Sequence, residues 1–132
     1  MITYKTSLEG ITANKLEGFC ARWKTPLSRK QLFTVLKNSS YFVLAFDTDT
    51  DRVIGFVNAL SDGIQFAFIP MLEVLPDYRK KGIGSNLMEK KLDLLDKFDC
   101  IDLTCDPSMQ SFYKRFSMLE SHGMVLRKFL DR

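Results

Sequence analysis

The stretch FAFIPMLEVLPDYRKKGIGSNLMEKKL, residues 66–92, joins an apolar run, a basic turn with two glycines and an amphipathic run. The apolar run predicts a strand over residues 64–75. Pro70 within it indicates a bulge or a break in pairing, because proline cannot donate to a β-ladder. Beyond the glycines the apolar residues have helical spacing, and the buried side of this helix is expected to be Leu87, Met88, Leu92, Leu95 and Phe98. A strand that turns through glycines into a helix favours an α/β domain.

Further strands and helices are predicted on both sides of this stretch. Strands are expected at residues 2–6, 41–46, 52–60, 100–105 and 124–130, the last of which closes the sheet. Ser28 and Gln31 form a capping box that begins a helix, and residues 107–116 predict a short helix with proline at its start. An earlier helix is expected to begin at Thr12, with Leu16, Phe19, Cys20 and Trp23 on its apolar side. Residues 1–132 are expected to form one domain.

The composition is that of a globular chain. Of 132 residues, 45% are apolar and 27% are charged, which excludes disordered and fibrous classes. The N-terminus lacks the apolar region of a secretory signal. No apolar run approaches the roughly 20 residues that span a bilayer. A cytoplasmic location without membrane contact is therefore expected.

The positive charge is concentrated near the glycines. The net charge is +3, but residues 79–91 hold five basic residues against one acid, and the remainder of the chain sums to −1. A focused basic spot fits a compact anionic ligand better than a nucleic acid, which needs a spread-out basic face. No nucleic-acid partner is expected.

No metal site or disulfide framework is expected. Three cysteines and one histidine, His122, form no zinc motif, and the cysteines are interpreted as small buried apolar side chains. The segment DTDTD, residues 47–51, resembles the opening of an EF-hand. Arg52 stands where that motif needs glycine and Asn58 where it needs glutamate, so a solvated hairpin turn is the better interpretation.

The glycine turn has the features of an anion site. A helix N-terminus exposes unpaired N–H groups and a partial positive charge. Gly82 and Gly84 lack a Cβ, so phosphate oxygens can approach the backbone closely. The pattern is neither a P-loop nor a Rossmann fingerprint, and by itself an ordinary tight turn explains it equally well.

Two longer segments carry a family resemblance. EVLPDYRKKGIGSNLMEKKL, residues 73–92, resembles the acyl-CoA signature of the GNAT superfamily of N-acetyltransferases, in which Arg/Gln-x-x-Gly-x-Gly/Ala follows a central strand. IDLTCDPSMQSFYKRFSM, residues 101–118, is similar to the family's strand, short helix and "FY" segment. HGMVLRKF and LEGFCARW also resemble small bacterial members. The resemblance implies an α/β (α+β) fold with a mixed, mostly antiparallel sheet, about four flanking helices and a splay at the acyl-CoA strand.

The resemblance also implies acetyl-CoA as co-substrate, with no metal. The pantetheine arm would pair with the strand backbone of Leu72, Glu73 and Val74. The pyrophosphate would lie on the backbone of residues 80–85. The residues implied in cofactor binding are Leu72, Glu73, Val74, Arg79, Lys80, Lys81, Gly82, Ile83, Gly84, Ser85, Asp106, Phe112 and Tyr113.

Two positions, one of them in this set, depart from the family pattern. Asp106 stands where many members have asparagine, and its carboxylate can accept hydrogen bonds but cannot donate an amide N–H. Ser117 replaces the glycine that usually follows the short helix, and serine is the poorer choice if the backbone there is left-handed.

Two side chains are candidates for catalysis. By resemblance, Tyr113 is the general acid, and a phenol with a pKa of about 10 is protonated at neutral pH and suits a thiolate leaving group. A half-buried tyrosine that only packs the helix on the sheet is the alternative. Glu73 is the candidate base that takes a proton from the amine. Many relatives carry an acid or histidine earlier on this strand, where this chain has Phe68 and Pro70, so a water chain remains an alternative to Glu73.

The expected activity is transfer of an acetyl group from acetyl-CoA to a primary amine by direct attack in a ternary complex. A non-catalytic acyl-CoA sensor and a binder of another phosphorylated ligand are the alternatives. The acceptor is a small-molecule or protein amine, and the chain is expected to be a monomer or homodimer. Phe19 and Trp23 belong either to the core or to the wall of the acceptor pocket.

Overall fold

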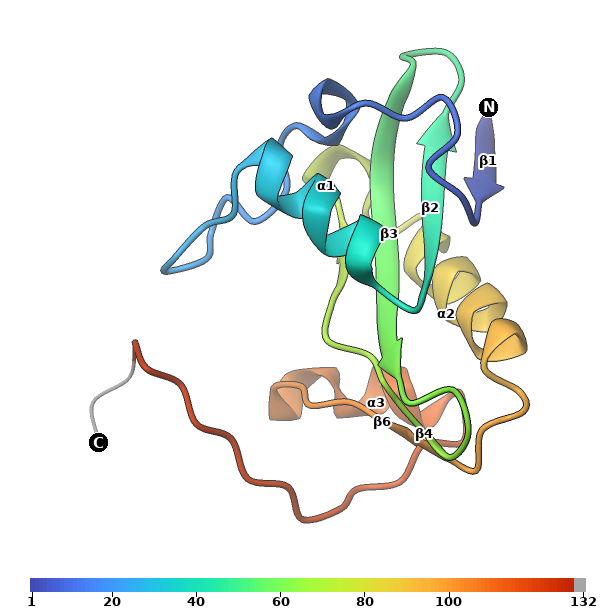
Figure 1. Cartoon of the computed structure of the whole chain (residues 1–132), viewed down its shortest axis with the longest axis vertical. Helices are drawn as coiled ribbons and strands as arrows, with labels where there is room; N and C mark the ends of the chain where they lie inside the picture. The colour runs from blue at the N-terminus through green and yellow to red at the C-terminus, as the bar shows by residue number, and fades with distance from the viewer. Residues whose placement is uncertain (130–132) are drawn as a thin grey trace.

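The computed structural model describes residues 1–129 and contains one mixed sheet flanked by helices (Figure 1). The strands are β1 (Ile2–Lys5), β2 (Tyr41–Asp47), β3 (Arg52–Ser61), β4 (Phe66–Phe68), β5 (Leu72–Val74) and β6 (Cys100–Asp102). The helices are α1 (Arg29–Asn38), α2 (Ile83–Leu94) and α3 (Gln110–Lys114), with 3-10 turns η1 (Ala13–Leu16), η2 (Pro76–Tyr78) and η3 (Pro107–Met109). The strand order is β1-β2-β3-β4-β6, and β5 also pairs with β3. All pairs are antiparallel except β4–β6, which confirms the expected mixed sheet and its parallel crossover.

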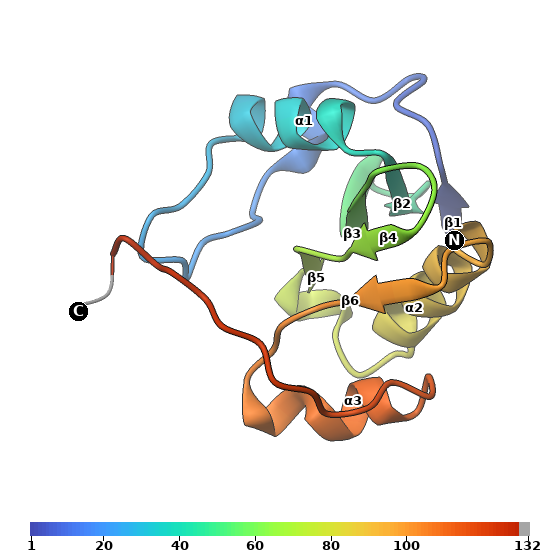
Figure 2. The ribbon, with the colours of Figure 1, turned by 60° about the horizontal axis from the view of Figure 1, so that its bottom comes forward.

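The central hairpin β2–β3 is buried on both faces, because α1 lies over one face and α2 over the other (Figure 2). On the α2 side, a Cβ at Gly55 would lie only 3.2 Å from Leu87 Cδ1, so glycine allows the helix to approach closely. Phe56, the next residue, points to the opposite face. There its ring meets the Phe19 ring edge-to-face at 5.1 Å.

The strand predicted over residues 64–75 is divided into β4 and β5, with Pro70 in the gap between them. Both strands pair with the same side of β3, but only β4 continues to β6, so the sheet splays at this point. Asn58 of β3 stabilises the gap. Its Oδ1 accepts a hydrogen bond from the Met71 N–H at 3.1 Å, and its own N–H donates to the Met71 carbonyl at 3.2 Å. The expected break in pairing is confirmed.

The first predicted helix is largely absent. Only the turn η1 forms, and the Thr12 side chain makes no capping bond. Gly18 and Cys20 then adopt left-handed backbone with φ of +97° and +62°, which no helix allows. The Cys20 N–H instead binds the Glu73 carboxylate, a partner 53 residues away that helical periodicity cannot reveal. The capping box of α1 is confirmed, with Gln31 N–H to Ser28 Oγ at 3.1 Å and Ser28 N–H to Gln31 Oε1 at 2.9 Å.

Two other expectations need correction within residues 1–129, and the number of helices differs slightly from the expected one. Residues 124–129 of the predicted closing strand pair with no strand, while Leu130 lies outside the described residues. Cys105 is exposed and Cys100 half-buried, because β6 ends at Asp102, so only Cys20 fits the interpretation of buried cysteines. Three α-helices, supplemented by the 3-10 turns, stand where about four helices were expected. None of the helices in this part of the chain is long and apolar enough to cross a membrane.

Candidate active site

Strand β5 has an edge that no other strand of residues 1–129 pairs with, here called its free edge. On its paired edge, the Leu75 N–H donates to the Ile54 carbonyl at 2.9 Å, and Glu73 lies opposite Phe56. Because bonded residues alternate along an antiparallel pair, the N–H and C=O groups of Leu72 and Val74 point away from β3. Such an edge can accept an extended ligand that carries amide groups.

Helix α2 begins next to this edge. Gly82, at φ +79°, is its N-cap, and the first intrahelical bond runs from the Asn86 N–H to the Gly82 carbonyl at 3.0 Å. The N–H groups of Ile83, Gly84 and Ser85 therefore have no intrahelical acceptor and are suited to an anion. The Ile83 side chain is buried in the core, so only its backbone is available to a ligand.

One basic residue at this helix start was missed by sequence reasoning. Arg115 follows α3, and its Nη2 donates to Ser85 Oγ at 2.8 Å while its guanidinium lies 4.8 Å from the centre of the Phe112 ring. Arg115 lies within the segment 101–118, but the resemblance gives it no role, and only the packing of α3 beside α2 brings it here. Conversely, Lys91 was counted in the basic cluster, but it is completely buried.

The basic turn before α2 is anchored to the β2–β3 hairpin. The Tyr78 hydroxyl donates to Asp47 Oδ2 at 2.6 Å, and this bond lowers the pKa of Asp47 and raises that of Tyr78. Lys81 Nζ lies 5.6 Å from the centre of the Tyr78 ring and borders a hollow of about 340 Å³. The Lys80 side chain is exposed, and its backbone has the left-handed conformation, with φ +63°.

Arg79 is directed to the free edge of β5. Its Nε donates to the Val74 carbonyl at 2.9 Å, so one acceptor of that edge already has a partner. A carbonyl oxygen has two lone pairs, and Val74 can accept a second hydrogen bond.

The "FY" residues lie near the start of α2. A Cβ at Gly84 would be 3.8 Å from Phe112 Cζ and 4.0 Å from Val74 Cγ2, so these three predicted residues converge. Tyr113 is half-buried and packs edge-to-face on Phe112 at 5.0 Å between ring centres. Burial, with a smaller effect of nearby Cys105, raises the pKa of Tyr113 and keeps its phenol protonated at neutral pH. Asp106 is exposed, and its side chain makes no capping bond to η3.

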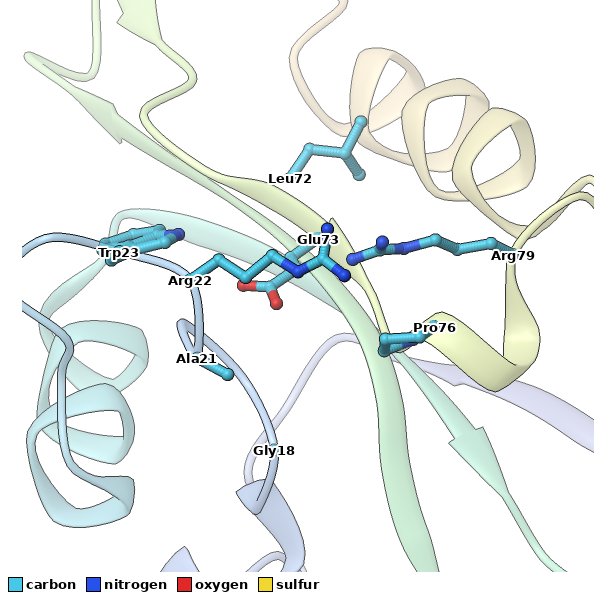
Figure 3. Close-up of a pocket in the computed structure, with 8 residues that line it drawn as sticks. All are labelled: Gly18, Ala21, Arg22, Trp23, Leu72, Glu73, Pro76 and Arg79. Carbon is cyan, nitrogen blue, oxygen red and sulfur yellow. The ribbon is translucent and has the colours of Figure 1, made fainter.

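Glu73 borders a cleft of about 200 Å³ (Figure 3). The lining residues are Gly18, Ala21, Arg22, Trp23, Leu72, Glu73, Pro76 and Arg79. Both carboxylate oxygens of Glu73 accept from the Cys20 N–H, at 3.0 and 3.2 Å, which fixes their orientation. Arg22 and Arg79 extend toward one another in front of Glu73.

The two aromatic residues of the N-terminal segment have different places. Trp23 is 41% exposed and lines the cleft, whereas Phe19 is buried in the core against Phe56. Their uneven exposure follows from the irregular chain after η1, because a regular helix would have placed both on one side. Among residues 1–129, no three His, Cys, Asp or Glu side chains cluster as metal ligands.

A splayed sheet with a free central edge, beside a helix start suited to anions, is the architecture of a protein that binds an extended phosphorylated ligand. A model of the acetyltransferase (GNAT) family matches residues 9–118, and the chain belongs to this family. The resemblance inferred from the two sequence segments is confirmed, and acetyl transfer is the class of reaction that the family supports.

Individual relatives agree with this assignment. A crystal structure of a candidate acetyltransferase from Deinococcus radiodurans R1 is 42% identical and superposes with a TM-score of 0.92, covering 96% of this chain and 88% of that one. The GNAT family acetyltransferase SP0256 from Streptococcus pneumoniae TIGR4 is 25% identical, with a TM-score of 0.70 and coverage of 98% and 100%. An uncharacterized N-acetyltransferase, ycf52, from Pyropia yezoensis is 27% identical over 89% of this chain and 70% of its own length.

Proposed function

We propose that this protein transfers the acetyl group of acetyl-CoA to a primary amine, by direct attack of the amine within a ternary complex. The observation that carries the proposal is the convergence of three features on β5. Residues 72–74 form its free edge. Val74 lies at contact distance from the start of α2, and Leu72 and Glu73 line the cleft. Family membership supports acetyl transfer in general. These three features support the narrower proposal, because they offer groups that can bind acetyl-CoA and a carboxylate that can act as the base for an amine.

The residues present fit acetyl-CoA. The amides of its pantetheine arm match the outward N–H and C=O groups of Leu72 and Val74. Its pyrophosphate suits the free N–H groups at residues 83–85, with Lys80 and Arg115 as nearby positive charges. Gly84 has no side chain, so the phosphates can approach the backbone N–H groups beside it closely.

Acetyl-CoA supplies a thioester whose carbonyl carbon an amine can attack. In the proposed reaction Glu73, directly or through water, takes one proton from the incoming ammonium and leaves a neutral nucleophile. The C–N bond forms, the C–S bond breaks, and Tyr113 gives its phenolic proton to the departing sulfur. The second proton released by the amine returns to the Tyr113 oxygen, so charge and protons balance.

The cleft also restricts the acceptor. Glu73 is opposite in charge to an ammonium group, and Arg22 and Arg79 lie in front of it. Trp23 adds an exposed apolar face at the same cleft. An amine that also carries an acidic group and an apolar part matches this lining best.

The test begins with a screen of amines at fixed acetyl-CoA, with thiol release as the readout. With an acceptor in hand, Tyr113→Phe keeps the ring and removes the donor, and kcat should fall about 100- to 10,000-fold. The acetyl-CoA Kd, measured by calorimetry, should stay unchanged, which marks an interaction made in the transition state. Glu73→Gln keeps an acceptor for the Cys20 N–H and should lose most activity at low pH, where the amine most needs a base.

Tyr41→Phe is the matched control, because Tyr41 is also half-buried but lies on β2. Parental turnover in Tyr113→Phe would remove this tyrosine from the mechanism. Tight acetyl-CoA binding without thiol release for any amine would favour the non-catalytic sensor instead.

A further inference from the structure

The C-terminal arm, residues 119–129, is an apolar segment that lies in solvent. All eleven residues are exposed, none is in a helix or strand, and Met124 is 99% exposed. The large apolar side chains of the arm are Leu119, Met124, Val125, Leu126 and Phe129. Apolar side chains concentrated in one exposed segment mark an interaction site. The run MVLRKF also has the composition of a strand.

The arm is directed away from the sheet of its own chain. It leaves α3 and runs toward the loop after η1 (Figure 1, Figure 2). Two surface contacts hold it there: Glu120 pairs with Lys114 at 3.0 Å, and the Phe129 carbonyl accepts from Lys24 Nζ at 2.8 Å. Neither contact covers an apolar side chain.

An uncovered apolar surface lies at the far end of the same sheet. Strand β6 is last in the strand order, so one of its edges is unpaired within the described chain. Leu60 lies opposite Phe68, and Phe66 is two residues from Phe68, so the three side chains share one face. All three are exposed. This edge and face, with the residues 60, 66, 68 and 100–102, form the β6 surface.

We propose that two copies of this chain exchange their C-terminal arms, each arm adding a strand to the β6 edge of the partner and covering its exposed apolar face. Both complementary surfaces belong to one chain, so the exchange closes as a two-fold dimer. Addition of a strand to an open sheet edge supplies main-chain hydrogen bonds and removes an edge that otherwise invites aggregation.

Charge favours this pairing. Residues 99–106, which include β6, contain Asp99, Asp102 and Asp106 and no basic residue. Residues 124–129 of the arm contain Arg127 and Lys128 and no acid. Opposite charges on the two surfaces steer their association and fix its register.

The apolar area is in the range of a small dimer interface. Complete burial of a large apolar side chain removes about 60–120 Å² of apolar surface. The eight side chains on each copy, five in the arm and three on the β6 surface, are partly exposed and together equal about five whole side chains, so two copies supply roughly 600–1,200 Å². Specific dimers begin at about 1,000 Å², and the main-chain pairing of the two arms adds to this area.

Charge reversal tests the exchange in the full chain. Light scattering should give the parent twice the 15.2 kDa mass of one chain. The arm variant, Arg127→Glu with Lys128→Glu, and the edge variant, Asp99→Lys with Asp102→Lys, should each weaken the dimer at least about tenfold. An equimolar mixture of the two should recover a tight heterodimer, because each arm then meets an edge of opposite charge.

The mixture distinguishes exchange between copies from pairing within one chain. If the arm folded on its own β6, mixing two mismatched chains would restore nothing. A control variant, Lys30→Glu with Lys37→Glu on the exposed side of α1, should dimerise like the parent. A monomeric parent would overturn the proposal, as would an arm variant that dimerises at parental strength. Far-UV circular dichroism of every variant confirms that it is folded.

Discussion

Replacement of Lys91 with methionine should stabilise the fold and change its dependence on pH. Lys91 lies on α2 with no exposed surface, and its ammonium makes no hydrogen bond within the described residues. Within the described residues, the positive charge of Lys91 has one favourable partner, the face of the Tyr41 ring, whose centre lies 5.9 Å from Nζ. Burial lowers the pKa of Lys91 from 10.5 to about 7. Methionine retains most of the apolar stem and removes the amine.

The magnitude follows from this pKa. One unit corresponds to about 1.4 kcal/mol, so the penalty for burying the protonated amine reaches about 5 kcal/mol well below pH 7 and is about 4 kcal/mol at pH 7. The folded pKa lies below the unfolded one, so between pH 7 and 10.5 the unfolded state binds more protons and the parent gains stability as pH rises. At pH 10 the penalty is only about 1 kcal/mol. The advantage of Lys91→Met should therefore shrink by about 3 kcal/mol between pH 7 and pH 10.

Urea unfolding of the parent and variant at pH 7 and pH 10 measures this difference directly. The difference between the two proteins removes the contribution of other groups that titrate in this range. Lys90→Met is the control, because Lys90 is the exposed neighbour on the same helix, and its effect should stay within about 0.5 kcal/mol. If Lys91→Met is no more stable than the parent at pH 7, the amine is solvated or paired and the reasoning from burial is wrong.

Three other changes test the site and its surroundings. Gly84→Asp should weaken acetyl-CoA binding in calorimetry, because its carboxylate would enter the space beside Phe112; Gly84→Ala fits at ordinary contact distances and is the control. Lys80→Ala should flatten the salt dependence of acetyl-CoA affinity, and an unchanged dependence would make Lys80 an ordinary solvated side chain. Ser117→Gly should raise the free energy of unfolding by up to about 1 kcal/mol, because Ser117 has φ +65°; a loss of stability would show that its hydroxyl has a structural role.

Local chemistry determined the elements that the sequence predicted correctly. The capping box at Ser28 and Gln31 begins α1 because both partners lie within one turn. Gly82 ends the basic turn in left-handed backbone, and Pro70 interrupts pairing because it lacks an N–H. The family and its fold class followed from the same stretch, since the order of strand, glycine turn and helix is a property of neighbouring residues.

Only the tertiary structure decided the features that depend on distant partners. Cys20 leaves the helix that its neighbours predict because the Glu73 carboxylate, far along the chain, accepts its N–H. Arg115 reaches Ser85, and Trp23 reaches the Glu73 cleft, through packing that no periodicity encodes. Lys91 has the charge of a surface residue, yet the placement of α2 on β2 and β3 buries it. Residues 124–129 have the composition of a strand, but a strand forms only where an edge is within reach, and none of the described strands lies along their course.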